Sequence, residues 1–96
     1  MPGTGESRTV RIRVAGLVQG VGFRFFVLRE AGRIGVKGYV RNLPDGSVEA
    51  VASGGNVAVE EFISRLRIGP SSARVSGVAV EEIRGSRDYD GFEVVF

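Results

Sequence analysis

Three closely spaced glycines followed by an arginine form the segment of this chain whose residue types are best suited to chemistry. The segment spans Gly16 to Arg24 and reads GLVQGVGFR. It follows the run from Arg8 to Val14, where apolar and charged residues alternate as in a strand with one buried face. After it, apolar residues recur at helical spacing, at Phe23, Val27, Ala31 and Ile34. The glycines therefore fall at a strand-to-helix turn, which predicts positive φ angles or close backbone approach.

A turn of this kind points several backbone N–H groups at one spot, beside the positive end of the helix dipole. Such an arrangement binds anions, and phosphate most naturally. We expect Arg24, at the start of the helix, to add a planar guanidinium that reaches the same anion in a bidentate way. The predicted phosphate-binding residues are Gln19, Gly20, Val21, Gly22, Phe23 and Arg24.

Two common phosphate-binding patterns do not fit this segment. The dinucleotide fingerprint needs a third glycine at position 25, where Phe25 stands, and no G-x-x-x-x-G-K-[ST] string occurs in the chain. From physical chemistry alone, an incidental glycine-rich connection therefore remains an alternative.

The rest of the chain predicts three further strands, a second helix and a short final strand. A strand over Val36–Arg41 and another over Val48–Ala52 flank the turn from Asn42 to Gly46, which contains the turn formers Pro and Gly. Asn56 is a candidate N-cap for a helix that ends at Gly69-Pro70. A fourth strand follows over residues 73–83, with a break in alternation near Gly77 that suggests a bulge, and the last strand covers residues 92–96.

This order, β-α-β-β-α-β with a short extra C-terminal strand, predicts an α+β, ferredoxin-like sandwich. We expect an antiparallel sheet with both helices on one face. Residues 1–7 are predicted to be a disordered tail and residues 8–96 one domain. In this topology the first two strands run the same way with the third between them. The glycine-rich loop and Asn42 therefore meet at one edge of the sheet, about 10 Å apart.

Two segments of the chain resemble the two signatures of the acylphosphatase family. Residues 16–24 are similar to the first, and residues 38–49, GYVRNLPDGSVE, are similar to the second. The resemblance extends from Arg8 to Phe96. It implies hydrolysis of an acyl phosphate to a carboxylate and inorganic phosphate without a metal or organic cofactor. By position, it implies that Arg24 binds the phosphoryl group and that Asn42 orients the attacking water.

The composition is compatible with that chemistry. The chain has no cysteine and no histidine, which excludes disulfides, thiol nucleophiles, histidine bases and the common zinc sites. A carboxylate leaving group has a conjugate acid with a pKa of only about 4, so its departure needs no general acid. The carboxylates Glu49, Glu81 and Glu82 are expected to be solubilising groups on exposed strand faces. We therefore predict no metal site and no cofactor, and inorganic phosphate as both product and competitive inhibitor.

Charge and hydropathy point to a small-molecule partner. The net charge is only +2, and Arg8, Arg11 and Arg13 alternate along one strand as a solvated face, so no nucleic-acid partner is expected. No apolar run approaches the length of a membrane span, so we predict a cytoplasmic monomer without a membrane partner. Two alternatives remain open. One is a module that binds phosphate or a phosphorylated ligand without turnover. The other, disfavoured by the charged strand faces, is an RNA-binding domain.

Overall fold

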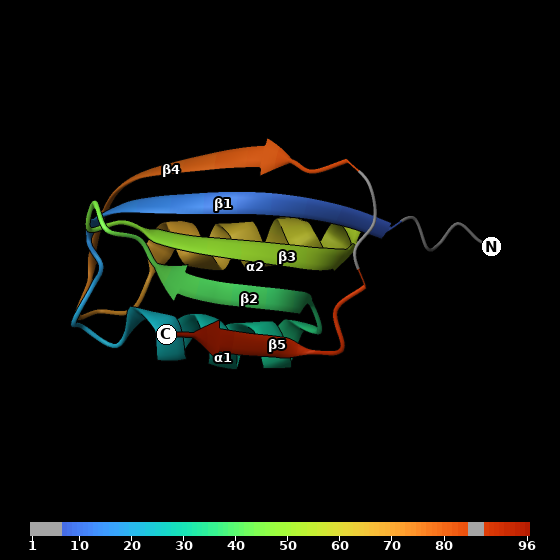
Figure 1. Ribbon diagram of the computed structural model, residues 1–96, viewed down its shortest axis with the longest axis horizontal. Helices are drawn as coiled ribbons and strands as arrows, with labels where there is room; N and C mark the ends of the chain where they lie inside the picture. Colours follow the sequence, from blue (N-terminus) through green and yellow to red (C-terminus); the bar gives the residue numbers. More distant parts are fainter. Residues whose placement is uncertain (1–6, 85–87) are drawn as a thin grey trace.

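The chain forms one five-stranded sheet with two helices packed on one of its faces (Figure 1). The computed structural model describes residues 7–84 and 88–96. Of the predicted disordered tail, only Ser7 is described, and the remaining residues lie outside this range. No helix among the described residues has the length and apolar character needed to cross a membrane. In chain order the elements are β1 (Ser7–Leu17), α1 (Phe23–Ile34), β2 (Lys37–Asn42), β3 (Val48–Gly55), α2 (Asn56–Ile68), β4 (Arg74–Glu82) and β5 (Phe92–Val95).

The strand order is β4-β1-β3-β2-β5, which confirms the predicted ferredoxin-like arrangement. Strands β1 and β2 both pair antiparallel with β3, so they run in the same direction with β3 between them. The extra strand β5 pairs in parallel with β2, so the sheet is mixed rather than wholly antiparallel. This pairing covers the otherwise free backbone edge of β2. The carboxyl ends of β1 and β2 consequently lie at the same end of the sheet.

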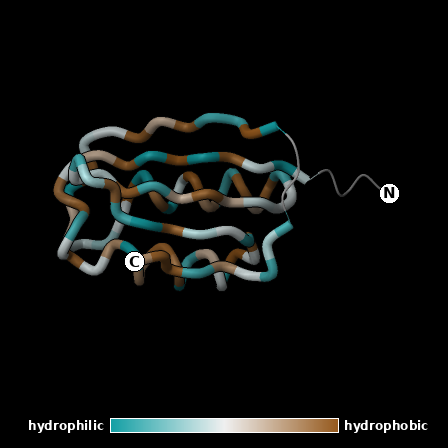
Figure 2. The backbone as a smooth tube through the Cα atoms, viewed as in Figure 1, coloured by the Kyte–Doolittle hydropathy of each residue, from teal (hydrophilic) through white to brown (hydrophobic). Residues whose placement is uncertain are grey.

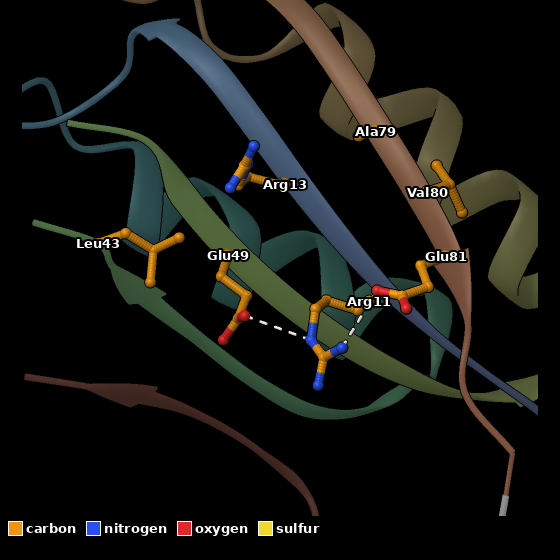
Figure 3. Close-up of a pocket in the computed structure, with 7 residues that line it drawn as sticks. All are labelled: Arg11, Arg13, Leu43, Glu49, Ala79, Val80 and Glu81. Atoms are coloured by element: carbon orange, nitrogen blue, oxygen red, sulfur yellow. Dashed lines mark hydrogen bonds and ion pairs between the residues drawn. The ribbon is translucent and has the colours of Figure 1, made fainter. Parts of the chain in front are cut away.

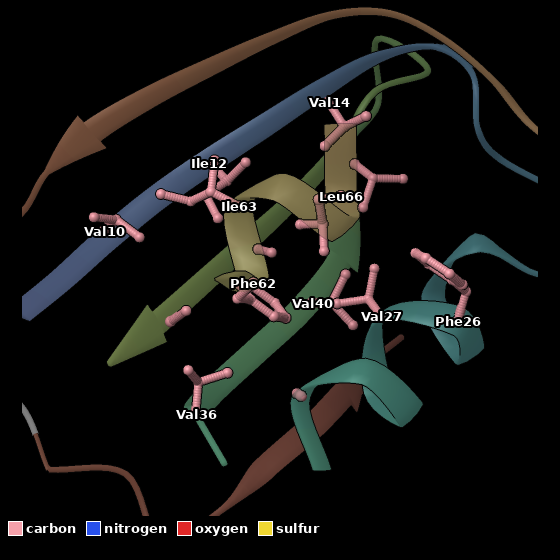
Figure 4. Packing of buried hydrophobic residues seen from close by; sticks show 14 of the residues in the cluster. Val10, Ile12, Val14, Phe26, Val27, Val36, Val40, Phe62, Ile63 and Leu66 are labelled. Atoms are coloured by element: carbon pink, nitrogen blue, oxygen red, sulfur yellow. The ribbon is translucent and has the colours of Figure 1, made fainter. Parts of the chain in front are cut away.

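The core lies between the sheet and the helices and follows the predicted periodicities. On β1, Val10, Ile12 and Val14 are fully buried, while Arg11 and Arg13 between them are exposed. Figure 2 shows this alternation as successive brown and teal segments along the strand. The helices contribute apolar residues at helical spacing, and Figure 4 shows how several of them meet the sheet. The buried apolar helix residues are Phe23, Phe26, Val27 and Ala31 from α1 and Val59, Phe62, Ile63 and Leu66 from α2.

Strand β1 is longer than its alternation predicts because its end pairs with β4. Gly16 and Leu17, which we expected in the turn, are the last residues of the strand. The register with β4 shifts between Ala15 and Gly16, opposite Gly77, which confirms the predicted bulge. Gly16 has a φ of 128°, and a Cβ there would overlap the carbonyl oxygen of Arg74. Only glycine therefore allows the two strands to approach this closely.

The predicted N-cap of the second helix is wrong. Asn56 is the first helical residue of α2, and Gly55 is the N-cap, with no side-chain cap hydrogen bond. The Asn56 side chain is used elsewhere, because its Oδ1 accepts a hydrogen bond of 3.0 Å from Nη1 of Arg8. The same guanidinium forms ion pairs with Glu60 and Glu82. The side chain that local sequence assigned to the helix cap is thus used in a hydrogen bond with Arg8, which is distant in sequence.

The two helices are also joined by an ion cluster centred on Glu30, which is only 7% exposed. Its Oε1 accepts hydrogen bonds from Nη2 of Arg33 at 2.7 Å and from Nε of Arg65 at 3.2 Å. The hydrogen bond from Arg33, assisted by the charge of Arg65, holds the pKa of Glu30 below its ordinary value. The carboxylate therefore stays ionised in the folded protein and links α1 to α2.

Candidate active site

Residues 18–22 connect β1 to α1 and contain two glycines with positive φ. Gly20 has a φ of 75°, and Gly22, the N-cap of α1, has a φ of 80°. Other residues adopt such angles only at a cost, which explains the glycine content of this loop. Within residues 7–84 and 88–96, the backbone hydrogen bonds of turns and caps use none of the N–H groups of residues 19–24 as donors. These groups lie at the amino end of α1, where the helix dipole favours an anion.

A pocket of about 210 Å³ joins this loop to the helix and to β2. Its wall combines Gly20 and Gly22 of the loop, Arg24 and Phe25 of the first turn of α1, and Asn42 at the end of β2, together with Val18 and Phe23. Two predicted site residues that are far apart in sequence, Arg24 and Asn42, therefore line the same cavity. Of the predicted phosphate-binding residues, Gln19 and Val21 are not part of the wall.

Arg24 is the charged residue of this pocket. Among the described residues of the pocket wall, it is the only one with an ionisable side chain. Its guanidinium carbon lies 4.7 Å from the centre of the Phe96 ring. A cation–π contact attracts the charge of the guanidinium and engages no oxygen or nitrogen acceptor. The contact can therefore hold Arg24 in place and leave its N–H groups available for an anion.

Asn42 brings an unusual polar atom to the pocket. Its Oδ1 is buried, and in the described part of the chain no protein group donates a hydrogen bond to it. A buried acceptor without a donor costs about 1–3 kcal/mol, so natural proteins rarely keep one unless a water or ligand uses it. Asn42 also lines the cavity that contains Arg24, so its side chain is a candidate acceptor for a bound molecule.

The side chain of Gln19 connects the glycine-rich loop to the turn that follows Asn42. Its Nε2 donates hydrogen bonds of 2.8 Å to the carbonyl oxygen of Leu43 and 2.9 Å to that of Ser47. The sequence predicts a contribution from the backbone N–H of Gln19 to phosphate binding, and the structure adds this contact of its side chain. The sequence signal for the side chain is a single polar residue inside an otherwise apolar and glycine-rich loop.

The turn after β2 is held together by its own hydrogen bonds, as its residue types predict. Ser47 donates to Oδ1 of Asp45 from its backbone N–H at 2.9 Å and from its hydroxyl at 2.5 Å. The hydroxyl bond and the backbone bond lower the pKa of Asp45 below its usual range. Gly46 has a φ of 95°, and its N–H donates to the carbonyl oxygen of Leu43 at 3.1 Å. Asp45 is therefore a turn residue, as predicted.

A second tether on the glycine-rich loop comes from Ser72, which the sequence did not suggest. Its hydroxyl donates a hydrogen bond of 2.7 Å to the carbonyl oxygen of Val21. Ser72 lies between α2 and β4, so nothing in the local sequence links it to the loop. The loop is thus held from two sides, by Gln19 toward β2 and by Ser72 toward β4.

The open face of the sheet, away from the helices, carries a separate hollow of about 320 Å³ (Figure 3). Arg11 and Arg13 are exposed there, as predicted, but Glu49 is only 7% exposed. Its carboxylate accepts a hydrogen bond of 2.8 Å from Nε of Arg41 and lies 3.3 Å from Nε of Arg11. The expectation that Glu49 is a solvent-exposed group is therefore wrong, because long side chains from both neighbouring strands cover it.

The other two carboxylates considered from the sequence, Glu81 and Glu82, lie on opposite faces of β4, because Glu81 pairs with Arg11 and Glu82 with Val10. Glu81 and Glu82 are exposed, as predicted, and each is paired with an arginine of β1. Among the described residues, no group of three acidic, histidine or cysteine side chains is arranged to hold a metal ion. The pocket with Arg24 and Asn42 is therefore the best candidate for chemistry.

Comparison with known proteins identifies the family of this chain. The acylphosphatase family profile matches residues 10–94. An acylphosphatase of Methanothrix thermoacetophila is 44% identical over 87 residues, which cover 91% of this chain and 96% of that protein. An acylphosphatase of Caldivirga maquilingensis is 50% identical over 91 residues, covering 94% and 96%. The crystal structure of the acylphosphatase from Bacillus subtilis matches with a TM-score of 0.89 and 37% identity, covering 93% of this chain and 99% of that one.

This chain therefore belongs to the acylphosphatase family, as the two signature segments predicted. The prediction that it is an enzyme is confirmed with the family.

Proposed function

We propose that this enzyme hydrolyses acyl phosphates by direct attack of water on phosphorus, within the pocket that contains Arg24 and Asn42. The observation that carries the proposal is that one cavity is lined by the cation Arg24, by the glycine-rich loop and by Asn42. Within residues 7–84 and 88–96, the loop N–H groups donate to no turn or cap hydrogen bond, and the buried Oδ1 of Asn42 has no donor. Acyl phosphate hydrolysis is the activity that the family and the structural neighbours support. The roles of the individual residues are our assignment.

The phosphoryl group binds to the loop and to Arg24. Backbone N–H groups at the amino end of α1 donate to its equatorial oxygens, and the guanidinium donates in a bidentate way. Phosphoryl transfer needs little covalent participation from the protein and depends on position and on charge stabilisation. Donors fixed by the glycine-rich backbone stabilise the charge that develops in the transition state without reorganising.

Asn42 orients the attacking water. Its Oδ1 accepts a hydrogen bond from the water, which satisfies the buried oxygen, and its amide group can donate to a second oxygen. An amide is too weak a base to remove the proton of the water. The proton therefore passes to an oxygen of the substrate's own phosphoryl group. The P–O bond to the acyl group breaks as the new one forms, and the leaving carboxylate needs no general acid because its conjugate acid has a pKa of about 4.

The hydrogen bonds of the Gln19 side chain fix the position of Asn42 relative to the loop that binds the phosphoryl group. Asn42 lies on β2, while the phosphoryl group lies on the loop after β1, and β3 separates the two strands. The two hydrogen bonds from Gln19 join that loop directly to the residues that follow Asn42. Gln19 is thus a positioning residue, because it sets the place of the water relative to phosphorus without contacting either.

Phosphate release from benzoyl phosphate in water enriched in ¹⁸O tests this proposal. Attack on phosphorus places the heavy oxygen in inorganic phosphate and leaves benzoate unlabelled. Inorganic phosphate should also inhibit competitively, because product and substrate share the loop. Label in benzoate would mean attack on the carbonyl carbon, and a kcat/KM that does not respond to millimolar phosphate would place the site elsewhere.

A further inference from the structure

Apolar side chains are exposed beside the pocket rather than buried. The described residues include five large hydrophobic side chains that are strongly exposed, of which Phe25 lines the pocket and Phe96 contacts Arg24. Phe25 lines the pocket and is 59% exposed, and Phe96 is 89% exposed with its ring against the Arg24 guanidinium. An exposed aromatic ring on a pocket wall is a common means of binding an apolar ligand group.

We propose that Phe25 and Phe96 form the binding surface for the acyl group, so that the preferred substrates carry an uncharged apolar or aromatic acyl group. This inference rests on the proposed function, because it takes the phosphoryl group to be held by the loop and Arg24. The acyl carbon is joined to that phosphoryl group through one bridging oxygen. The acyl group of the bound substrate therefore lies close to the side chains beside Arg24. These include two aromatic rings, Phe25 on the pocket wall and Phe96 against the guanidinium.

The charges of the pocket support the same substrate class. Among the described residues of its wall, Arg24 is the only charged one, and the phosphoryl group occupies it. A second anionic group on the acyl part, such as a further phosphate or carboxylate, would find no cation on this wall. Such a group would instead lie against aromatic rings and lose hydration without a partner. An apolar chain gains from the same contact.

The chain-length dependence of kcat/KM tests this inference with acetyl phosphate and hexanoyl phosphate. The two leaving carboxylates have nearly equal basicity, so the substrates differ mainly in four methylene groups. Full burial of one methylene favours binding about fourfold, so partial cover of four predicts a kcat/KM about tenfold higher for hexanoyl phosphate. The variant Phe25→Ala should lower this ratio at least threefold. Because Phe25 is exposed, the substitution should leave the thermal melting temperature nearly unchanged.

Val57→Ala is the matched control. Val57 is 81% exposed and lies in the first turn of α2. That turn follows Gly55, which pairs with Ser7 at the opposite end of the sheet from the pocket. The control should keep the wild-type ratio of the two substrates.

Binding of hexylphosphonate and methylphosphonate, measured by calorimetry, separates this inference from the proposed hydrolysis. Tighter binding of hexylphosphonate, weakened in Phe25→Ala, supports the apolar surface even if neither acyl phosphate is hydrolysed, and in that case only the hydrolysis proposal fails. Equal kcat/KM for the two acyl phosphates, or a preference that survives in Phe25→Ala, would overturn the inference while leaving the hydrolysis proposal intact.

Discussion

The substitution Gln19→Leu tests whether the geometry of this site depends on a single side chain. Leucine has a similar size but no donors, so it removes both hydrogen bonds to the turn after β2 and keeps the loop backbone. Neither carbonyl oxygen is left without a partner. That of Leu43 still accepts from Gly46 at 3.1 Å, and that of Ser47 still accepts from Leu43 at 2.8 Å. The substitution should therefore loosen the link without destroying the turn.

The expected effects differ for stability and for catalysis. Two neutral hydrogen bonds at about 1 kcal/mol each predict a loss of about 1–2 kcal/mol. For a domain of this size, that loss lowers the Tm by about 5–15 °C. Because the tether sets the position of Asn42, the water should shift relative to phosphorus, and a displacement near 1 Å can cost about a hundredfold in rate. We expect kcat to fall about tenfold to a hundredfold, while affinity for inorganic phosphate changes by no more than a few-fold.

The assay is kcat and KM on an acyl phosphate, phosphate binding by calorimetry and a thermal melt, all on the same preparation. Ser72→Ala is the matched control, because it removes the other side-chain tether of the loop, on Val21, which has no link to Asn42. It should weaken phosphate binding more than it lowers kcat. A folded Gln19→Leu enzyme with wild-type kcat would refute the reasoning, and so would equal changes in both variants.

Three further outcomes are expected. Arg24→Lys should lower kcat/KM about tenfold to a hundredfold, since an ammonium cannot form two parallel bonds in fixed geometry; unchanged kinetics would make Arg24 a surface charge. Asn42→Ala should lower kcat about a hundredfold and leave phosphate affinity within a few-fold; a near-native kcat in a folded variant would remove Asn42 from the mechanism. Glu30, whose pKa is lowered mainly by its hydrogen bond from Arg33, stabilises the fold fully above its ordinary value of 4.5 and progressively less as the pH falls below it. Thermal melts from about pH 5 to pH 3 should therefore show a smaller loss of stability for Glu30→Gln than for the wild type, and equal slopes would contradict this.

Much of the active-site prediction rests on local sequence because backbone conformation there is a local property. Gly20 and Gly22 have the positive φ angles that their loop required, and α1 begins beside Arg24. The pairing of Arg24 with Asn42 in one pocket also followed from sequence, through topology. Once the β-α-β-β order is fixed, right-handed connections bring the ends of β1 and β2 to one end of the sheet.

Other features depended on residues that are distant in sequence and could not be read from it. Local residue types assigned Asn56 to a helix cap, but Arg8 engages its side chain. Strand alternation placed Glu49 in solvent, but arginines on both neighbouring strands bury it.

The sequence by itself predicted the elements, their order and the glycine-rich loop, and its resemblance to the family pointed to the two residues to which we assign the chemistry. Only the tertiary structure decided which side chains support them. Gln19 donates to two carbonyl oxygens of the turn after β2, and the Phe96 ring contacts the guanidinium of Arg24. The physical reason is the separation along the chain of the groups that interact. Backbone angles and periodicity are set by neighbours in the chain, whereas a side-chain hydrogen bond or ring contact is decided by whichever group the fold brings within a few ångströms.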